Sequence, residues 1–160
     1  MTFEEKIDKL KHKFSLQDFN DPYIYGIEIL KAVERKFIRI KDIRNDLNNL
    51  RPGYALWSEN IKNKTEIRSI DTTDLNQWLE KLDPNKNYWM VVPSRAHIPG
   101  KNLIFDCKPN ALVAVHSIIQ SSFILVDKKY NWLLSFESGE MEKTTIYKSG
   151  NGLTPFEIEP

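Results

Sequence analysis

The segment FILVDKKYNWLLSF, residues 123–136, decides how this chain folds. Its two apolar runs, Ser122–Asp127 and Asn131–Glu137, are separated by the short polar connection Lys128-Lys129-Tyr130. Runs rich in branched and aromatic residues on either side of such a connection are typical of a β-hairpin. The sequence therefore predicts an antiparallel pair of strands in the C-terminal part of the chain.

Further strands are predicted on both sides of this hairpin. Tyr88–Val92 and Leu103–Asp106 are runs of β-forming residues bounded by turn residues, and Asn110–Gln120 between them and the hairpin has helical spacing. Glu140–Tyr147 follows as an edge strand. Residues 151–160 contain Gly and Pro, and we expect a loose surface tail there.

The N-terminal part is predicted to be helical. Thr2 and Glu5 fit a capping box, and apolar residues then recur at helical spacing over 3–14, 22–37 and 40–50. Strands over Tyr54–Trp57 and Thr65–Ile70 and a short helix over 71–82 follow. Helices followed mainly by strands predict an α+β fold, in which the helices cover one face of a mainly antiparallel sheet. Residues 1–160 should form a single domain.

Composition excludes several classes of protein. The 160 residues include 23 Lys+Arg and 22 Asp+Glu, so the net charge of +1 makes nucleic acid an unfavourable partner. One cysteine, Cys107, rules out an intramolecular disulfide and a multi-cysteine zinc site. No glycine-rich phosphate loop is present and the three histidines are scattered, so we expect no cofactor and no metal.

The expected location is the cytoplasm. The N-terminus lacks the apolar run of a secretory signal, and the longest apolar stretches are far shorter than the ~20 residues of a membrane-spanning helix. A free thiol fits a reducing compartment. Abundant Lys, Ile and Asn with little Ala and Gly are typical of AT-rich bacterial genomes, which predicts a bacterial protein.

Catalytic chemistry has one candidate group. Cys107 with a histidine, Arg95 and His97 in one loop, and Asp106 beside the cysteine supply the residue types of a small hydrolase or transferase. A buried cysteine that packs as a small hydrophobe and a loop that caps backbone groups explain the same residues. The second reading is favoured, and with it a non-enzymatic role.

A basic cluster spans the end of the second predicted helix and the start of the third. It consists of Arg35, Lys36, Arg39, Lys41 and Arg44. Such a cluster can bind RNA or an acidic partner. Glu34, Asp42 and Asp46 interrupt it, which favours a solvated helical face.

Aromatic residues give the strongest indication of function. Neighbours in a strand point to opposite faces, so one member of Tyr88-Trp89 and one of Tyr130-Asn131-Trp132 should point away from the core. A sheet face carrying Tyr88, Tyr130 and Trp57, with Arg95 in the adjacent loop, suits a partner-binding surface.

The second half of the chain resembles small bacterial α+β proteins, some of which are immunity proteins that neutralise a toxin. The resemblance covers about Tyr88 to Glu137 and rests on YWMVV (88–92), FDC (105–107), Ala111-Leu112 and the hairpin. It implies a partner protein and no catalytic residues. Immunity proteins against nucleases are commonly acidic, and this chain is balanced in charge. We therefore expect a cytosolic, non-enzymatic domain that binds and occludes another protein, with its oligomeric state left open by the sequence.

Overall fold

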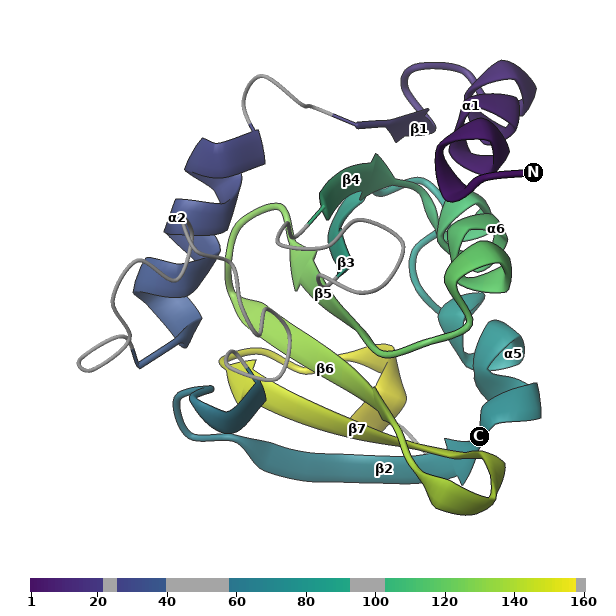
Figure 1. Cartoon of the computed structure of the whole chain (residues 1–160). Helices are drawn as coiled ribbons and strands as arrows, with labels where there is room; N and C mark the ends of the chain where they lie inside the picture. Colours follow the sequence, from purple (N-terminus) through teal and green to yellow (C-terminus); the bar gives the residue numbers. More distant parts are fainter. Residues whose placement is uncertain (22–25, 40–57, 93–102, 158–160) are drawn as a thin grey trace.

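The computed structural model describes residues 1–21, 26–39, 58–92 and 103–157. It confirms the α+β class, with helices against one antiparallel sheet of seven strands in the order β1-β4-β3-β5-β6-β7-β2 (Figure 1). The helices are α1 (Phe3–Lys13), α2 (Gly26–Phe37), α5 (Leu75–Leu79) and α6 (Pro109–Ile119). The strands are β1 (Phe19–Asn20), β2 (Thr65–Asp71), β3 (Tyr88–Val92), β4 (Leu103–Cys107), β5 (Phe123–Asp127), β6 (Trp132–Ser138) and β7 (Lys143–Gly150). Short 3-10 turns occupy Thr72–Asp74, Glu140–Glu142 and Pro155–Glu157.

The predicted hairpin forms the centre of the sheet. Phe123 lies opposite Phe136 and Val126 lies opposite Leu133, so β5 and β6 pair along their length. The carboxylate of Asp127 closes the turn by accepting from the backbone N–H groups of Asn131 and Trp132, at 2.7 and 3.0 Å. The polar residue that ends the first apolar run therefore fixes the connection to the second.

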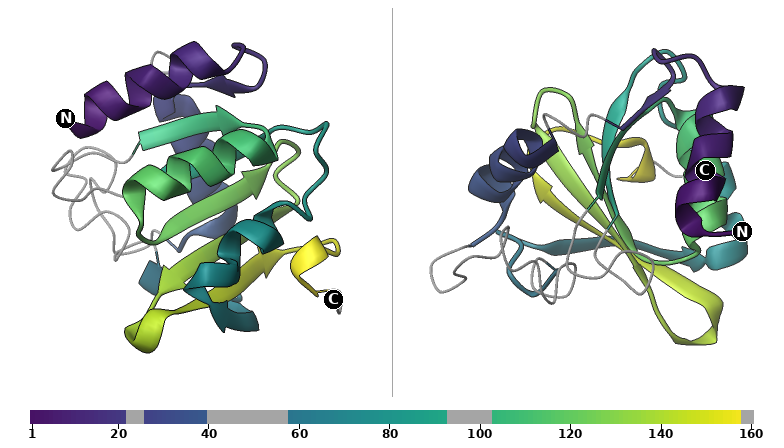
Figure 2. Two further views of the ribbon diagram at one scale, coloured as in Figure 1. Left: turned by 90° about the vertical axis from the view of Figure 1, so that its right-hand side faces the viewer. Right: turned by 45° about the horizontal axis from the view of Figure 1, so that its top comes forward.

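One face of the sheet packs under α1, α5 and α6. α1 begins at Thr2, whose hydroxyl accepts from the Glu5 backbone N–H at 3.1 Å, as the capping box predicts. The left view of Figure 2 shows these three helices in front of the sheet and α2 behind it. On this face Phe123 and Phe136, on the neighbouring strands β5 and β6, stack with ring centroids 4.5 Å apart, and both are fully buried. This face holds the larger apolar core.

α2 packs on the opposite face, which corrects the prediction that all helices lie on one side. Leu30, Val33 and Phe37 are buried against apolar residues of the central strands. A Cβ at Gly26 would lie 2.9 Å from Cγ2 of Ile104, so glycine permits the close approach of the helix to β4. The sheet is therefore the middle layer of three.

Two predictions about the C-terminal part are wrong. β7 is an interior strand between β6 and β2, so β2 forms the edge. The segment after β7 is held by the core: Phe156 is fully buried and packs edge-on against Phe136 at 5.3 Å. Arg68 Nε donates to the Phe156 carbonyl at 2.9 Å, so residues 154–157 are anchored rather than loose.

The helix predicted over 40–50 and the strand predicted over 54–57 lie outside the described residues. Within the described ranges, no helix combines the length and apolar character needed to cross a membrane.

Candidate functional site

The predicted aromatic face is not open. Tyr88 is 6% exposed and packs with Trp132, ring centroids 5.9 Å apart, on the face covered by α1, α5 and α6. The alternation that the sequence predicts is present, but the outward orientation assigned to Tyr88 is wrong because its side chain contributes to the larger core. Trp57 and Arg95, the other residues assigned to that surface, lie outside the described residues.

Trp89 and Tyr130 share the α2 side of the sheet and are half-buried. The Lys128 ammonium lies 3.4 Å from the centroid of the Trp89 ring and 2.8 Å from a carboxylate oxygen of Asp106. Burial raises the pKa of Tyr130, while a hydrogen bond with Trp89 opposes the shift. The chain's own cation therefore covers the tryptophan, in the geometry of a cation–π contact.

The candidate catalytic group is not assembled in the described structure. Cys107 is fully buried, and this burial raises the pKa of its thiol well above the usual value, which suppresses the reactive thiolate. Asp106 is engaged by Lys128 and by the Asn87 amide at 2.8 Å. Arg95 and His97 lie outside the described residues. His116 packs beside Phe123, and burial lowers its pKa.

A hydrogen-bonded network that the sequence did not indicate joins residues 58–64 to the sheet. Glu137 Oε2 accepts from the Ser58 hydroxyl at 2.8 Å, from the Ser135 hydroxyl at 3.0 Å and from the Lys64 ammonium at 2.8 Å. Lys64 also donates to the Ser58 carbonyl at 3.0 Å and lies over the Tyr147 ring. A serine beside a lysine can form a nucleophile–base pair, but here the ammonium is bound to a carboxylate. The network therefore acts as a lock between segments.

Basic residues converge where α2 ends. Ile38 and Ile61 form an isolated antiparallel β-bridge. The backbone N–H of Arg39 donates to the Asn60 carbonyl, and that of Lys62 donates to the Phe37 carbonyl, both at 2.7 Å. The Lys62 ammonium reaches the Arg35 carbonyl at 3.1 Å. These contacts add Lys62 to the part of the predicted basic cluster that the structure describes. We call Arg35, Lys36, Arg39 and Lys62 the basic corner.

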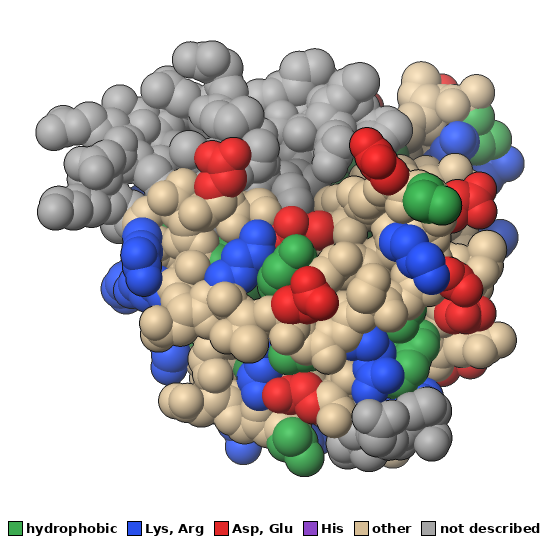
Figure 3. All heavy atoms as spheres, turned by 90° about the horizontal axis from the view of Figure 1, so that it is seen from below, with side chains coloured by type: hydrophobic (Ala, Val, Ile, Leu, Met, Phe, Trp, Pro, Cys, Tyr) green, Lys and Arg blue, Asp and Glu red, His purple; other side chains and the backbone are tan. Residues whose placement is uncertain are grey.

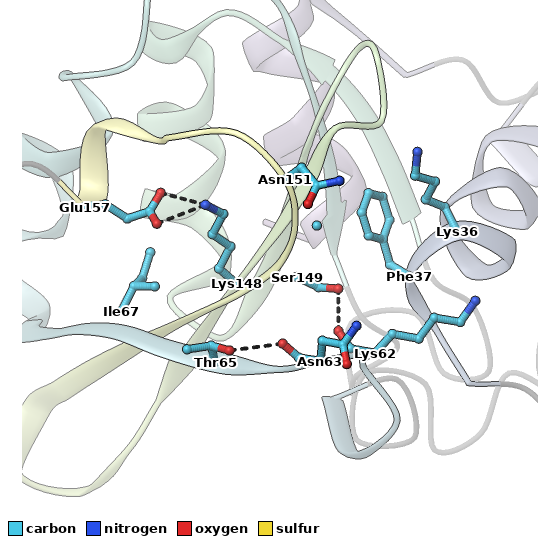
Figure 4. A pocket seen from close by; sticks show the side chains of 11 residues that line it. Lys36, Phe37, Lys62, Asn63, Thr65, Ile67, Lys148, Ser149, Asn151 and Glu157 are labelled. Atoms are coloured by element: carbon cyan, nitrogen blue, oxygen red, sulfur yellow. Dashed lines mark hydrogen bonds and ion pairs between the residues drawn. The ribbon is translucent and has the colours of Figure 1, made fainter.

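A pocket of about 500 Å³ opens beside the basic corner, between the end of α2 and the ends of β2 and β7 (Figure 4). It is lined by Lys36, Phe37, Lys62, Asn63, Thr65, Ile67, Lys148, Ser149, Gly150, Asn151 and Glu157. These residues come from four separate stretches of the chain, which is why the sequence alone gave no sign of the pocket.

One wall of the pocket is an internal ion pair. Lys148 donates to both carboxylate oxygens of Glu157 at 2.9 Å and to the carbonyl of Gly152. Burial of Glu157 opposes its ionisation, but the hydrogen bonds from Lys148 and from the Thr154 backbone hold its pKa below the usual value. This wall is therefore neutral overall, and all three ammonium donors of Lys148 have partners.

The opposite wall carries net positive charge. Across the described ranges, neither Lys36 nor Lys62 forms an ion pair with a carboxylate. Leu153, in the segment that carries the Gly152 and Thr154 contacts, is 72% exposed.

Comparisons with protein-family models, with curated proteins and with solved structures gave no match.

Proposed function

We propose that this protein is a non-enzymatic binding domain that docks an acidic surface of another protein at the basic corner. The observation that carries the proposal is the charge of that corner. Arg35, Lys36 and Arg39 are exposed, and no described carboxylate pairs with them. Complementary charge on a partner accelerates association and selects the correct orientation.

Several lysines elsewhere in the described structure are paired with a carboxylate, unlike the basic side chains of this corner. Lys11 binds Asp21 at 2.7 Å, Lys108 binds Asp18 at 2.7 Å and Lys143 binds Asp71 at 2.5 Å. Basic and acidic side chains also alternate over the face that lies under β2 (Figure 3). A local group of like charges without a described counter-charge fits a surface that a partner neutralises.

A protein suits the corner better than a nucleic acid. Single-stranded RNA is commonly bound through exposed aromatic rings on which bases stack. The aromatic residue at this corner, Phe37, is 1% exposed and belongs to the core. Leu153 offers an exposed apolar side chain near the pocket, and apolar contact surrounded by polar groups is typical of protein interfaces.

The finer role that we propose is of the immunity type, in the cytoplasm of a bacterium. The resemblance of the second half of the chain supports a toxin as the partner, and the basic corner then requires an acidic patch on that toxin. The burial of Cys107 supports binding rather than catalysis.

The proposal is tested by comparing capture of a partner from the source cells by matched variants. Arg35→Gln/Arg39→Gln removes two charges from the corner, and Lys9→Gln/Lys13→Gln removes two exposed charges from α1. The captured protein, identified by mass spectrometry and purified, should bind the first variant about tenfold more weakly than the wild type and the second one normally.

Equal binding of the partner to both variants would overturn the proposal. Capture that ribonuclease abolishes, with a steep dependence on salt, would replace the protein partner with RNA.

A further inference from the structure

The pocket beside the basic corner has a size and a polarity that suit a small acidic group. Its volume is about 500 Å³, and four of its lining residues are lysine or asparagine side chains other than Lys148: Lys36, Lys62, Asn63 and Asn151. Figure 4 shows Lys36 and Lys62 at the α2 end of the pocket, the Lys148–Glu157 pair at the other end, and Asn63 and Asn151 between them. Ligand pockets of this size commonly fix their ligand through a few converging polar groups.

Some of the lining groups have spare hydrogen-bonding capacity and others do not. Lys148 is saturated by Glu157 and Gly152, so it contributes no free donor. The side-chain amides of Asn63 and Asn151 have no hydrogen-bond partner among the described residues, and an asparagine amide can donate two hydrogen bonds. Two ammonium groups and two amides therefore remain for a ligand.

From this arrangement we propose that the pocket binds a pair of carboxylates. The proposal rests on the proposed function: the carboxylates are neighbouring acidic side chains of the partner protein. Two separate ammonium groups, Lys36 and Lys62, match two separate negative charges, and the neutral Lys148–Glu157 pair leaves that balance unchanged.

Phosphate is a poorer match for the same groups. Phosphate sites commonly use backbone N–H groups at the start of a helix or the planar fork of arginine. This pocket meets the C-terminal end of α2 rather than the start of a helix, so it lacks a set of free backbone N–H groups of that kind. No arginine is among the described residues that line it.

The test follows the Asn63 and Asn151 side-chain amide signals by NMR while probes are added at constant ionic strength. The probes are an N-acetylated tetraglutamate amide, glutarate and inorganic phosphate. The tetraglutamate should shift both amide signals, and Lys36→Met/Lys62→Met should weaken this response at least tenfold. Lys9→Met/Lys13→Met, which removes two charges from α1, should leave it unchanged. The remaining amide spectrum reports whether each variant is folded.

Each outcome decides the proposal. A response to tetraglutamate alone assigns the carboxylates to a protein segment, and an equal response to glutarate assigns them to a free dicarboxylic acid. Stronger binding of phosphate, an equal response in the Lys36→Met/Lys62→Met variant, or no shift with either carboxylate probe overturns it.

This result is separable from the proposed function. A partner that binds through Arg35 and Arg39 without moving the Asn63 and Asn151 signals leaves the proposed function standing and removes the carboxylate pocket. Conversely, shifts with tetraglutamate when no partner depends on Arg35 and Arg39 leave the carboxylate pocket standing and remove the proposed function.

Discussion

The two faces of the sheet differ in how many neighbouring strands carry apolar side chains in one row. On the face under α1, α5 and α6, the paired residues Met90, Leu125, Leu134 and Lys148 are apolar until β7 is reached. On the α2 face, the row Val91, Ile124, Ser135 and Tyr147 changes to polar one strand earlier. The first face concentrates apolar burial, whereas the second combines a smaller core with the Glu137 network. The pocket takes lining residues from both faces, Lys148 from the first and Phe37 from the second.

The difference shows how one sheet can serve both stability and contact. Several helices bury a wide apolar area on the first face, and that burial is the main favourable term in folding. Among the described residues, α2 covers part of the second face, and polar groups that lie beyond its end can meet other molecules. The comparison yields predictions for each face, from the largest expected effect to the smallest.

Replacement of Phe123 by alanine tests the first face. The side chain is fully buried and stacked on Phe136 at 4.5 Å, so its loss leaves a cavity in the larger core. We expect the free energy of unfolding to fall by about 3–5 kcal/mol. Urea denaturation monitored by circular dichroism measures this change, and a loss below 1 kcal/mol would show that this face is not the main source of stability.

Glu137→Ala tests the polar network of the second face. The change leaves the Ser58 hydroxyl and the Lys64 ammonium without their carboxylate, which should cost about 1–3 kcal/mol. Glu140→Ala, at an exposed position in the next turn, should stay within about 0.5 kcal/mol of the wild type. Equal effects of the two substitutions in the same denaturation assay would contradict the lock between residues 58–64 and the sheet.

His116 makes the first face sensitive to acid. Burial lowers its pKa from the ordinary 6.5, so the unfolded chain binds a proton on this imidazole more readily than the folded chain. This residue's contribution to stability is thus fully present above pH 6.5 and declines as the pH falls through the lowered value. His116→Gln should reduce the loss of stability between pH 7.5 and pH 5.5, measured as the shift of the urea midpoint. An unchanged shift would assign the acid sensitivity to other groups.

The smallest effect on stability is expected at the basic corner. Arg35 and Arg39 are exposed and have no described carboxylate partner, so Arg35→Gln/Arg39→Gln should change the free energy of unfolding by less than about 0.5 kcal/mol. Thermal unfolding at low and high salt measures the effect. A loss above 1 kcal/mol would mean that the corner is part of the folding core rather than a surface for a partner.

The sequence correctly predicted the elements in which apolar residues recur with a clear helical or strand spacing. The strand over Tyr88–Val92 and the hairpin around residues 128–130 were located correctly because apolar runs and turn residues mark them locally. The helix of α1 was likewise indicated by its capping residue and its stripe. Alternation in β3 was also correct, but local pattern cannot tell which of Tyr88 and Trp89 faces the larger core.

The candidate site was beyond local pattern for a physical reason. The pocket is formed by α2, the start of β2, the end of β7 and Glu157. Periodicity within a segment does not predict contacts between segments that are far apart in the sequence. Ser58 and Glu137 are 79 positions apart, and their hydrogen bond depends on how β2, β6 and β7 associate. The burial of Phe156 was missed because Gly and Pro around it resemble a surface tail. Part of the basic cluster, by contrast, was visible in the sequence.

The strand order has a consequence for the order in which the sheet forms as the chain is synthesised. The two strands that are synthesised first, β1 and β2, form the two edges of the sheet, and they pair with β4 and β7, which are synthesised much later. On the ribosome both segments emerge without their partners, and loops of this length make such pairing slow to form. We expect β5 and β6 to gain protection in pulse-labelled hydrogen exchange before either edge does, so that the sheet is completed from its middle outward.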